Sequence, residues 1–146
     1  MKALAASALV ALTALAACNT SSGPPAFIAQ NSLQVIANPS RPVDFEVLQQ
    51  SPNGPSDYWC AAGDYAMRKL GVPSTARIYL RKPIGPAEFR SGRNAIGYTV
   101  DPSPELSQRA SVLPSRLTMS INRVGENWGA EHARFTCQTR AAMLRD

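Results

Sequence analysis

The chain has 146 residues and a formal net charge of +5, and 45% of its residues are hydrophobic against 17% charged. A chain of this length forms one domain, which excludes a large multidomain enzyme. The charged fraction is too low for a chain that is disordered throughout, and no apolar run reaches the roughly 20 residues of a membrane-spanning helix.

Residues 1–17 have the features of an export signal. Lys2 supplies a positive start, and the apolar run 3–17 is interrupted only by the polar residues Ser7 and Thr13. Such a run is too short to span a bilayer and ends in small residues, which is typical of a secretory signal peptide. One interpretation is an ordinary signal peptide that is cleaved at an A-x-A-like site.

The end of the apolar run favours a more specific interpretation. Its last residues, Leu15-Ala16-Ala17-Cys18, resemble the lipobox of bacterial lipoproteins. This resemblance implies that a diacylglycerol is attached to Cys18, that the signal is cleaved just before it, and that acyl chains anchor the mature protein to the membrane. In enteric lipoproteins an Asp after the Cys favours retention in the inner membrane. Asn19 stands there instead, so we expect a lipid-anchored protein of the outer membrane that faces the periplasm.

The rest of the chain divides by composition into a tether and a folded domain. Residues 18–31 are expected to be the lipidated N-terminus and a flexible tether, because Ser, Thr, Gly and a Pro pair dominate them without periodicity. Residues 32–146 are left for a single domain. All prolines avoid 56–72 and 115–146, so we expect these two stretches to be the most regular.

The first of these stretches is predicted to hold the main helix, at about 57–70. Ser56 or Asp57 is suited to cap its start, and Gly71 stands at the stop position. We place Asp64 on the solvent side. The apolar residues that recur at helical spacing define a buried stripe: Trp59, Ala62, Gly63, Ala66 and Leu70.

Alternating polarity predicts an antiparallel sheet beneath this helix, and hence an α+β domain. The alternation in 116–122 indicates a strand, and 131–138 is its expected return partner, with Ala133, Phe135 and Cys137 facing inward. The two would form a C-terminal hairpin. Shorter strands are expected at 33–37, 44–49, 76–81 and 95–100. Short helical turns are expected to start at Pro86 and Pro104.

Two cysteines remain once Cys18 is set aside. In an exported, oxidising compartment we expect Cys60 and Cys137 to form a disulfide that staples the helix to the sheet. Closing so long a loop stabilises the fold by roughly 4 kcal/mol in the chain-entropy model.

A thiol hydrolase is the remote alternative for Cys60. A helix start lowers the pKa of a thiol, and a cysteine there with His132 on a later strand resembles papain-like peptidases in topology alone. The residues around Cys60 do not match that family. On a regular strand His132 and Cys137 face opposite sides, so both cannot reach Cys60. We therefore expect no catalytic residue and, since no ligand spacing is present, no metal or cofactor.

The basic stretch, residues 77–93, accounts for the whole positive excess of the mature chain. Its basic residues are Arg77, Arg81, Lys82, Arg90 and Arg93, and its only acidic residue is Glu88. We predict that they form one exposed surface that contacts anionic lipid, lipopolysaccharide or acidic glycans. The alternative is that they only keep the domain soluble. Nucleic acid is remote from this compartment, so we expect no nucleic-acid partner.

Trp128, at the tip of the expected hairpin, is a candidate contact for a protein partner, because Trp is favoured at binding sites. It could instead fold back across the sheet. Together these features predict a small, non-catalytic lipoprotein of the cell envelope that binds an anionic component or a protein partner. A structural or assembly factor of the envelope is the alternative.

Overall fold

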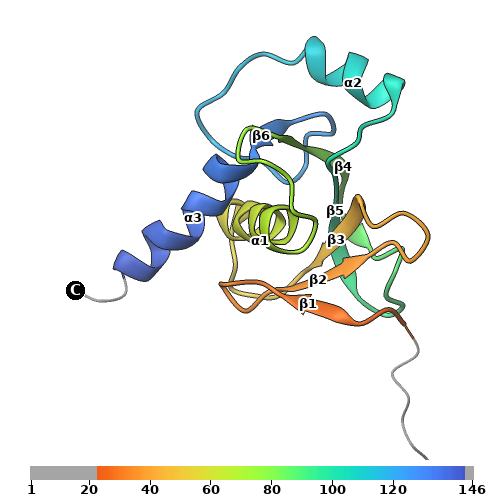
Figure 1. Ribbon diagram of the computed structural model, residues 1–146, viewed down its shortest axis with the longest axis vertical. Helices are drawn as coiled ribbons and strands as arrows, with labels where there is room; N and C mark the ends of the chain where they lie inside the picture. Colours follow the sequence, from red (N-terminus) through yellow and green to blue (C-terminus); the bar gives the residue numbers. More distant parts are fainter. Residues whose placement is uncertain (1–22, 144–146) are drawn as a thin grey trace, which may run out of the picture.

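The computed structural model describes residues 23–143, apart from the side chains of 139–141. Cys18 and the signal stretch lie outside the described residues. The fold is α+β, as expected: a sheet of six antiparallel strands carries the main helix on one face, and the C-terminal helix packs on that helix (Figure 1). Within the described part of the chain, no helix is both long and apolar enough to cross a bilayer.

The sheet has the strand order β1-β2-β3-β5-β4-β6. The strands are β1 (Ala26–Ile28), β2 (Gln34–Ala37), β3 (Asp44–Leu48), β4 (Arg77–Pro86), β5 (Asn94–Thr99) and β6 (Asn127–Gly129). The helices are α1 (Pro55–Arg68), α2 (Pro104–Ser111) and α3 (Ala130–Met143). Four of the expected strands therefore exist, as β2 to β5, although β4 runs on to Pro86. Pro86 ends a strand rather than starting a helical turn, whereas Pro104 begins α2 as expected.

Helix α1 begins at Pro55, slightly earlier than expected, and the carboxylate of Asp57 accepts a hydrogen bond from the backbone N–H of Gly54 at 2.8 Å. Gly71 ends the helical region with a positive φ of 70°, as its position indicated. Every residue from 57 to 66 is buried. The helix is enclosed because the sheet covers one side of it and α3 covers another.

The prediction that Asp64 faces solvent is therefore wrong, since its side chain is completely buried. It accepts hydrogen bonds from the backbone N–H of Gln30 at 2.9 Å and from the guanidinium groups of Arg68 and Arg134 at 2.8 and 3.2 Å. Burial alone would raise the pKa of Asp64. The hydrogen bonds from Arg68 and Gln30 and the charges of Arg68 and Arg134 outweigh burial, and the pKa lies below its ordinary value.

The expected C-terminal hairpin is also wrong, because residues 116–122 form no strand and 131–138 belong to α3. Ala130, Ala133 and Cys137 are buried, and their spacing of three and four residues places them on one side of a helix. Phe135, which strand alternation placed inward, is 58% exposed. A short apolar pattern of this kind is compatible with the period of a strand and with that of a helix. The tertiary contact with α1 stabilises the helix.

Gly63 makes the contact between the two helices possible. A Cβ atom at this position would lie 2.4 Å from the backbone nitrogen of Arg134, closer than any real contact allows. Only a residue without a side chain lets the backbones of α1 and α3 approach this closely. The sequence pattern placed Gly63 on the buried stripe, but the partner there is α3 rather than the sheet.

Strand β1 lies within the stretch that was expected to be a flexible tether. It pairs with β2 at the edge of the sheet, and the ring of Phe27 packs against Tyr65 with centroids 5.5 Å apart. The folded domain therefore begins before residue 32. The main core lies between the sheet and α1 and contains the buried rings of Trp59, Tyr65, Tyr98 and Phe45.

Candidate functional site

The predicted disulfide is confirmed. Cys60 and Cys137 are joined, with their Cα atoms 5.1 Å apart, and the bond links α1 to α3 rather than to the sheet. Both residues are buried, and Cys60 carries no free thiol in this structure. His132, the proposed partner of Cys60 in a thiol enzyme, instead stacks on Trp128 with ring centroids 5.0 Å apart.

The basic stretch is irregular at its centre. Leu80 of β4 lies opposite Tyr98 of β5, while Lys82 lies opposite Gly97, so that Arg81 is an extra residue in the strand. Such a bulge interrupts the alternation of side chains. Arg81 and Lys82 consequently both lie over Gly97, where an added Cβ would meet Lys82 Cβ at 2.9 Å and Arg81 Nη2 at 3.2 Å.

Over Gly97 the two basic side chains meet two carboxylates. Arg81 pairs with Glu88 at 2.8 Å, and Lys82 Nζ lies 3.4 Å from Glu46 and 3.9 Å from Glu88. Glu46 is completely buried and also accepts hydrogen bonds from the backbone N–H groups of Glu88 and Phe89. These contacts hold the segment after β4 against the second face of the sheet, and they neutralise both basic residues.

The remaining members of the basic stretch lie apart from this cluster. Arg90 donates to the backbone carbonyl of Pro24 at 2.8 Å, and the exposed Arg93 lies 3.4 Å from the carbonyl of Gln49. Arg77 stands at the other end of β4. The basic stretch therefore does not form one exposed surface. A bulge interrupts its alternation, and Glu88 within the stretch and the buried Glu46 of β3 pair with Arg81 and Lys82.

Arg77 belongs to a different site, which we call the arginine cavity. This cavity of about 410 Å³ lies beside β6 and is lined by residues that include Arg77, Arg116, Arg123, Glu126 and Trp128. Arg77 comes from the start of β4, Arg116 and Arg123 come from the loop between α2 and β6, and Trp128 comes from β6 itself. The structure thus brings together two of the sequence candidates and adds two arginines that the sequence analysis missed.

Hydrogen bonds orient the walls of the arginine cavity. Glu126 is 3% exposed, and its carboxylate pairs with Arg123 at 3.0 Å and accepts from the indole N–H of Trp128 at 2.9 Å. Arg77 donates to the side-chain and backbone oxygens of Asn127. Trp128 is half-buried against the core, so the interpretation that it folds back, rather than standing exposed at a tip, is the one the structure supports.

Two arginines of the lining retain donors without acceptors among the described residues. Arg123 Nη1 is buried and has no hydrogen-bond partner among the described residues. Arg116 is exposed and forms no ion pair or hydrogen bond within residues 23–143. Three guanidinium groups face one carboxylate, so the cavity is positive. Planar guanidinium groups bind phosphate and carboxylate through paired N–H bonds, which makes a small anionic group the natural ligand.

The sequence analysis missed both arginines because Arg116 stands alone in the expected strand 116–122 and Arg123 stands alone just after it. No local pattern sets them apart from a solubilising arginine. Among the described residues, no group of three or more His, Cys, Asp or Glu side chains is placed to hold a metal ion. Comparison of the chain with protein-family models, curated proteins and solved structures found no match.

Proposed function

We propose that the protein is a small lipoprotein of the cell envelope, anchored through Cys18, whose folded domain binds anionic groups in the arginine cavity. The lipobox-like sequence Leu15-Ala16-Ala17-Cys18 supports the anchor. The Cys60–Cys137 disulfide supports an exported location, since such bonds persist in oxidising compartments. The domain serves as a binding or accessory protein without a catalytic centre.

The unpartnered donors of the arginine cavity carry this proposal. A buried guanidinium N–H without an acceptor, as at Arg123 Nη1, is costly unless a ligand or water completes its hydrogen bonding. Arg116 adds an exposed positive charge at the rim, and Arg77 is held at the wall by Asn127. Phosphates of anionic lipids or of lipopolysaccharide, and carboxylates of acidic glycans, supply the missing acceptors.

An assembly factor of the envelope is the second candidate, and one observation favours it. Several large apolar side chains outside the sheet are more than half exposed and are available for contact with a protein partner. They are Val112 at 75%, Leu117 at 100%, Phe135 at 58% and Met143 at 75%. Leu117 and His132 also line one shallow pocket beside the start of α1.

Charge reversal at Arg116 tests the arginine cavity. Residues 19–146 carrying Arg116→Glu should bind vesicles of phosphatidylglycerol and phosphatidylcholine about thirtyfold more weakly than the unchanged domain at about 0.1 M salt, where the Debye length is about 10 Å. This follows from about 1 kcal/mol for each basic charge near an anionic surface, with two charges altered. Arg116 has no partner within the described residues, so the fold should be unaffected. The measurement is vesicle co-sedimentation.

Arg93→Glu is the matched control, because it makes the same change of net charge at an exposed residue outside the cavity. It should reduce vesicle binding by less than about threefold, since charges beyond a Debye length are screened. Equal losses from the two variants would show that net charge, rather than the arginine cavity, governs binding. If the unchanged domain fails to bind, anionic lipid is not the partner.

Replacement of Cys18 tests the anchor. Cys18→Ala should abolish metabolic labelling of the protein with a fatty acid and leave either an uncleaved precursor or a released product, because the thiol that accepts the diacylglycerol is gone. The measurement is incorporation of a labelled fatty acid after immunoprecipitation. Labelling that persists in this variant would remove Cys18 as the anchor.

A further inference from the structure

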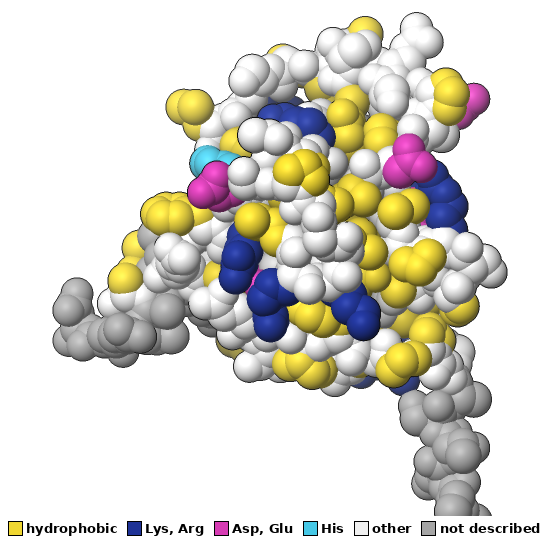
Figure 2. Space-filling model, in the orientation of Figure 1, with side chains coloured by type: hydrophobic (Ala, Val, Ile, Leu, Met, Phe, Trp, Pro, Cys, Tyr) yellow, Lys and Arg dark blue, Asp and Glu magenta, His cyan; other side chains and the backbone are white. Residues whose placement is uncertain are grey.

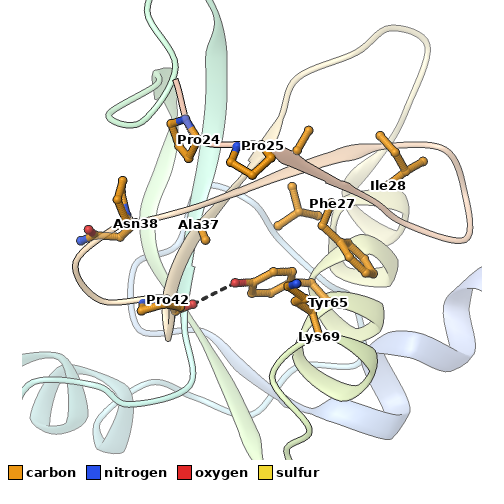
Figure 3. A pocket seen from close by; sticks show the side chains of 12 residues that line it. Pro24, Pro25, Phe27, Ile28, Ala37, Asn38, Pro42, Tyr65 and Lys69 are labelled. Carbon is orange, nitrogen blue, oxygen red and sulfur yellow. Dashed lines mark hydrogen bonds between the residues drawn. The ribbon is translucent and has the colours of Figure 1, made fainter. Parts of the chain in front are cut away.

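An apolar groove of about 700 Å³ lies along the β1–β2 edge of the sheet, next to α1 (Figure 3). β1 and β6 are the two edge strands, so the groove and the arginine cavity occupy opposite edges of the same sheet. Figure 2 shows hydrophobic side chains exposed along the lower part of the molecule, where Figure 1 places β1 and β2. This groove is not part of the function proposed above.

The groove has an aromatic floor and proline walls. Phe27 and Tyr65 meet edge to face with ring centroids 5.5 Å apart, and Val35 lies beside them. Pro24, Pro25, Pro39 and Pro42 line the sides and have no backbone N–H to offer a ligand. Ile28 at the rim is 55% exposed. Most of the lining therefore suits a hydrocarbon.

Three polar groups in this lining already have internal partners. The hydroxyl of Tyr65 donates to the carbonyl of Pro42 at 3.1 Å, and burial raises the pKa of Tyr65, so the hydroxyl keeps its proton. The carbonyl of Pro24 accepts from Arg90 at 2.8 Å, and the side-chain oxygen of Asn38 accepts from the backbone N–H of Ser40 at 3.0 Å.

Lys69 is the exception. It is the only charged residue in the lining of the groove, it is exposed, and its ammonium forms no ion pair or hydrogen bond within residues 23–143. Arg68, the residue before it, is already paired with the buried Asp64 at 2.5 Å. The mostly apolar groove thus carries one available positive charge, at Lys69 beside Tyr65 (Figure 3).

We infer that this groove binds a single long-chain fatty acid, with the alkyl chain along Phe27, Ile28 and the prolines and the carboxylate against Lys69. The volume of about 700 Å³ is within the usual range for small-molecule sites, roughly 300–1,000 Å³. Each methylene removed from water should tighten binding about fourfold. Charge complementarity at Lys69 favours an anionic amphiphile over a neutral or cationic one of equal length.

Residues 19–146, which include every described strand and helix and the disulfide, are the form to test after cooperative thermal unfolding has been verified. A fluorescent fatty acid should bind and should be displaced by myristate. Octanoate should displace it far more weakly, by about fourfold for each methylene lost. Myristyl trimethylammonium, which has the same chain with the opposite charge, should compete at least tenfold less well than myristate.

Three variants separate the part of the groove that holds the alkyl chain from the part that holds the carboxylate. Ala37→Trp, which fills the groove from β2, should abolish binding of the fluorescent fatty acid; Ile28→Asp, at the exposed rim, should weaken it if the tryptophan variant does not fold. Lys69→Glu should reverse the preference, so that the cationic amphiphile competes at least tenfold better than myristate. A purely structural role for Lys69 would not reverse a charge preference.

Failure of myristate to displace the probe, or an unchanged preference in Lys69→Glu, would overturn the inference. So would concentration-dependent dimerisation that Ala37→Trp disrupts, because the occupant would then be a second copy of the chain. Arg116→Glu should leave fatty-acid binding unchanged. Fatty-acid binding can therefore fail while the arginine cavity and the anchor at Cys18 stand, and the reverse.

Discussion

Asp64→Asn is expected to lower the free energy of unfolding by about 3 kcal/mol at neutral pH. Removing one partner from a buried ion pair costs roughly 3–5 kcal/mol. The lower figure applies here because Arg68 and Arg134 are 46% and 37% exposed and recover some hydration when the carboxylate is lost. Asparagine keeps the size of the side chain and an acceptor for the N–H of Gln30, so the loss reports mainly on the two arginines.

The same substitution should have a characteristic pH dependence. The pKa of Asp64 is lowered in the folded protein, so between the folded and unfolded values the unfolded chain binds more protons and stability rises with pH. The difference in free energy of unfolding between the unchanged protein and the asparagine variant should be complete above about pH 5. It should shrink as the pH falls below about 4 through the folded pKa of Asp64. Urea unfolding at several pH values measures both curves.

Asp101→Asn is the matched control for this experiment. Asp101 pairs with Arg41 at 2.6 Å, but its side chain is 69% exposed. Exposed ion pairs contribute roughly 0–1 kcal/mol, so this variant should lose little stability. A loss at Asp64 no larger than that at Asp101 would show that the contact between α1 and α3 does not depend on the buried carboxylate.

Replacement of both cysteines, as Cys60→Ser with Cys137→Ser, is expected to lower the free energy of unfolding by roughly 4 kcal/mol. The bond spans 77 residues of sequence, and the loop it closes restricts the unfolded chain. Reduction of the unchanged protein should reproduce most of the loss. Equilibrium unfolding measures both effects, and changing the cysteines together avoids leaving one buried thiol unpaired.

Mass spectrometry of the non-reduced protein tests directly whether the disulfide is present. A peptide pair joined through Cys60 and Cys137 is expected. Two free thiols, with Cys60 alkylated rapidly near neutral pH, would contradict the disulfide and would restore the nucleophile that a thiol hydrolase needs.

Local signals in the sequence were sufficient for much of the fold. The main helix is predictable because the cap at Ser56 or Asp57, the stop at Gly71 and the apolar stripe around Trp59 act within one or two helical turns. Strands β2, β3 and β5 were recognised from their alternation and their flanking turn residues. The pairing of Cys60 with Cys137 followed from parity, since only two cysteines remained for the exported domain.

The candidate sites depended on contacts between distant segments. Arg81 and Lys82 share one face only because a bulge opposite Gly97 interrupts β4, and Glu46 neutralises Lys82 from another strand. The arginine cavity joins Arg77 to Arg116 and Arg123, which are separated from it along the chain. No property of the individual residues indicates which arginines will find a carboxylate.

The sequence by itself determined the α+β class, the main helix, the inner strands and the cysteine pair, because these follow from periodicity, turn residues and residue counts. Only the tertiary structure decided that 131–138 is helical and that Asp64 is buried. In both cases the deciding term is the contact of α1 with α3 across Gly63, where the two backbones approach closely. Such packing outweighs the weak local preference of the residues for helix or strand. A short apolar pattern is compatible with either structure, and the neighbouring element that covers one face of it determines which one forms.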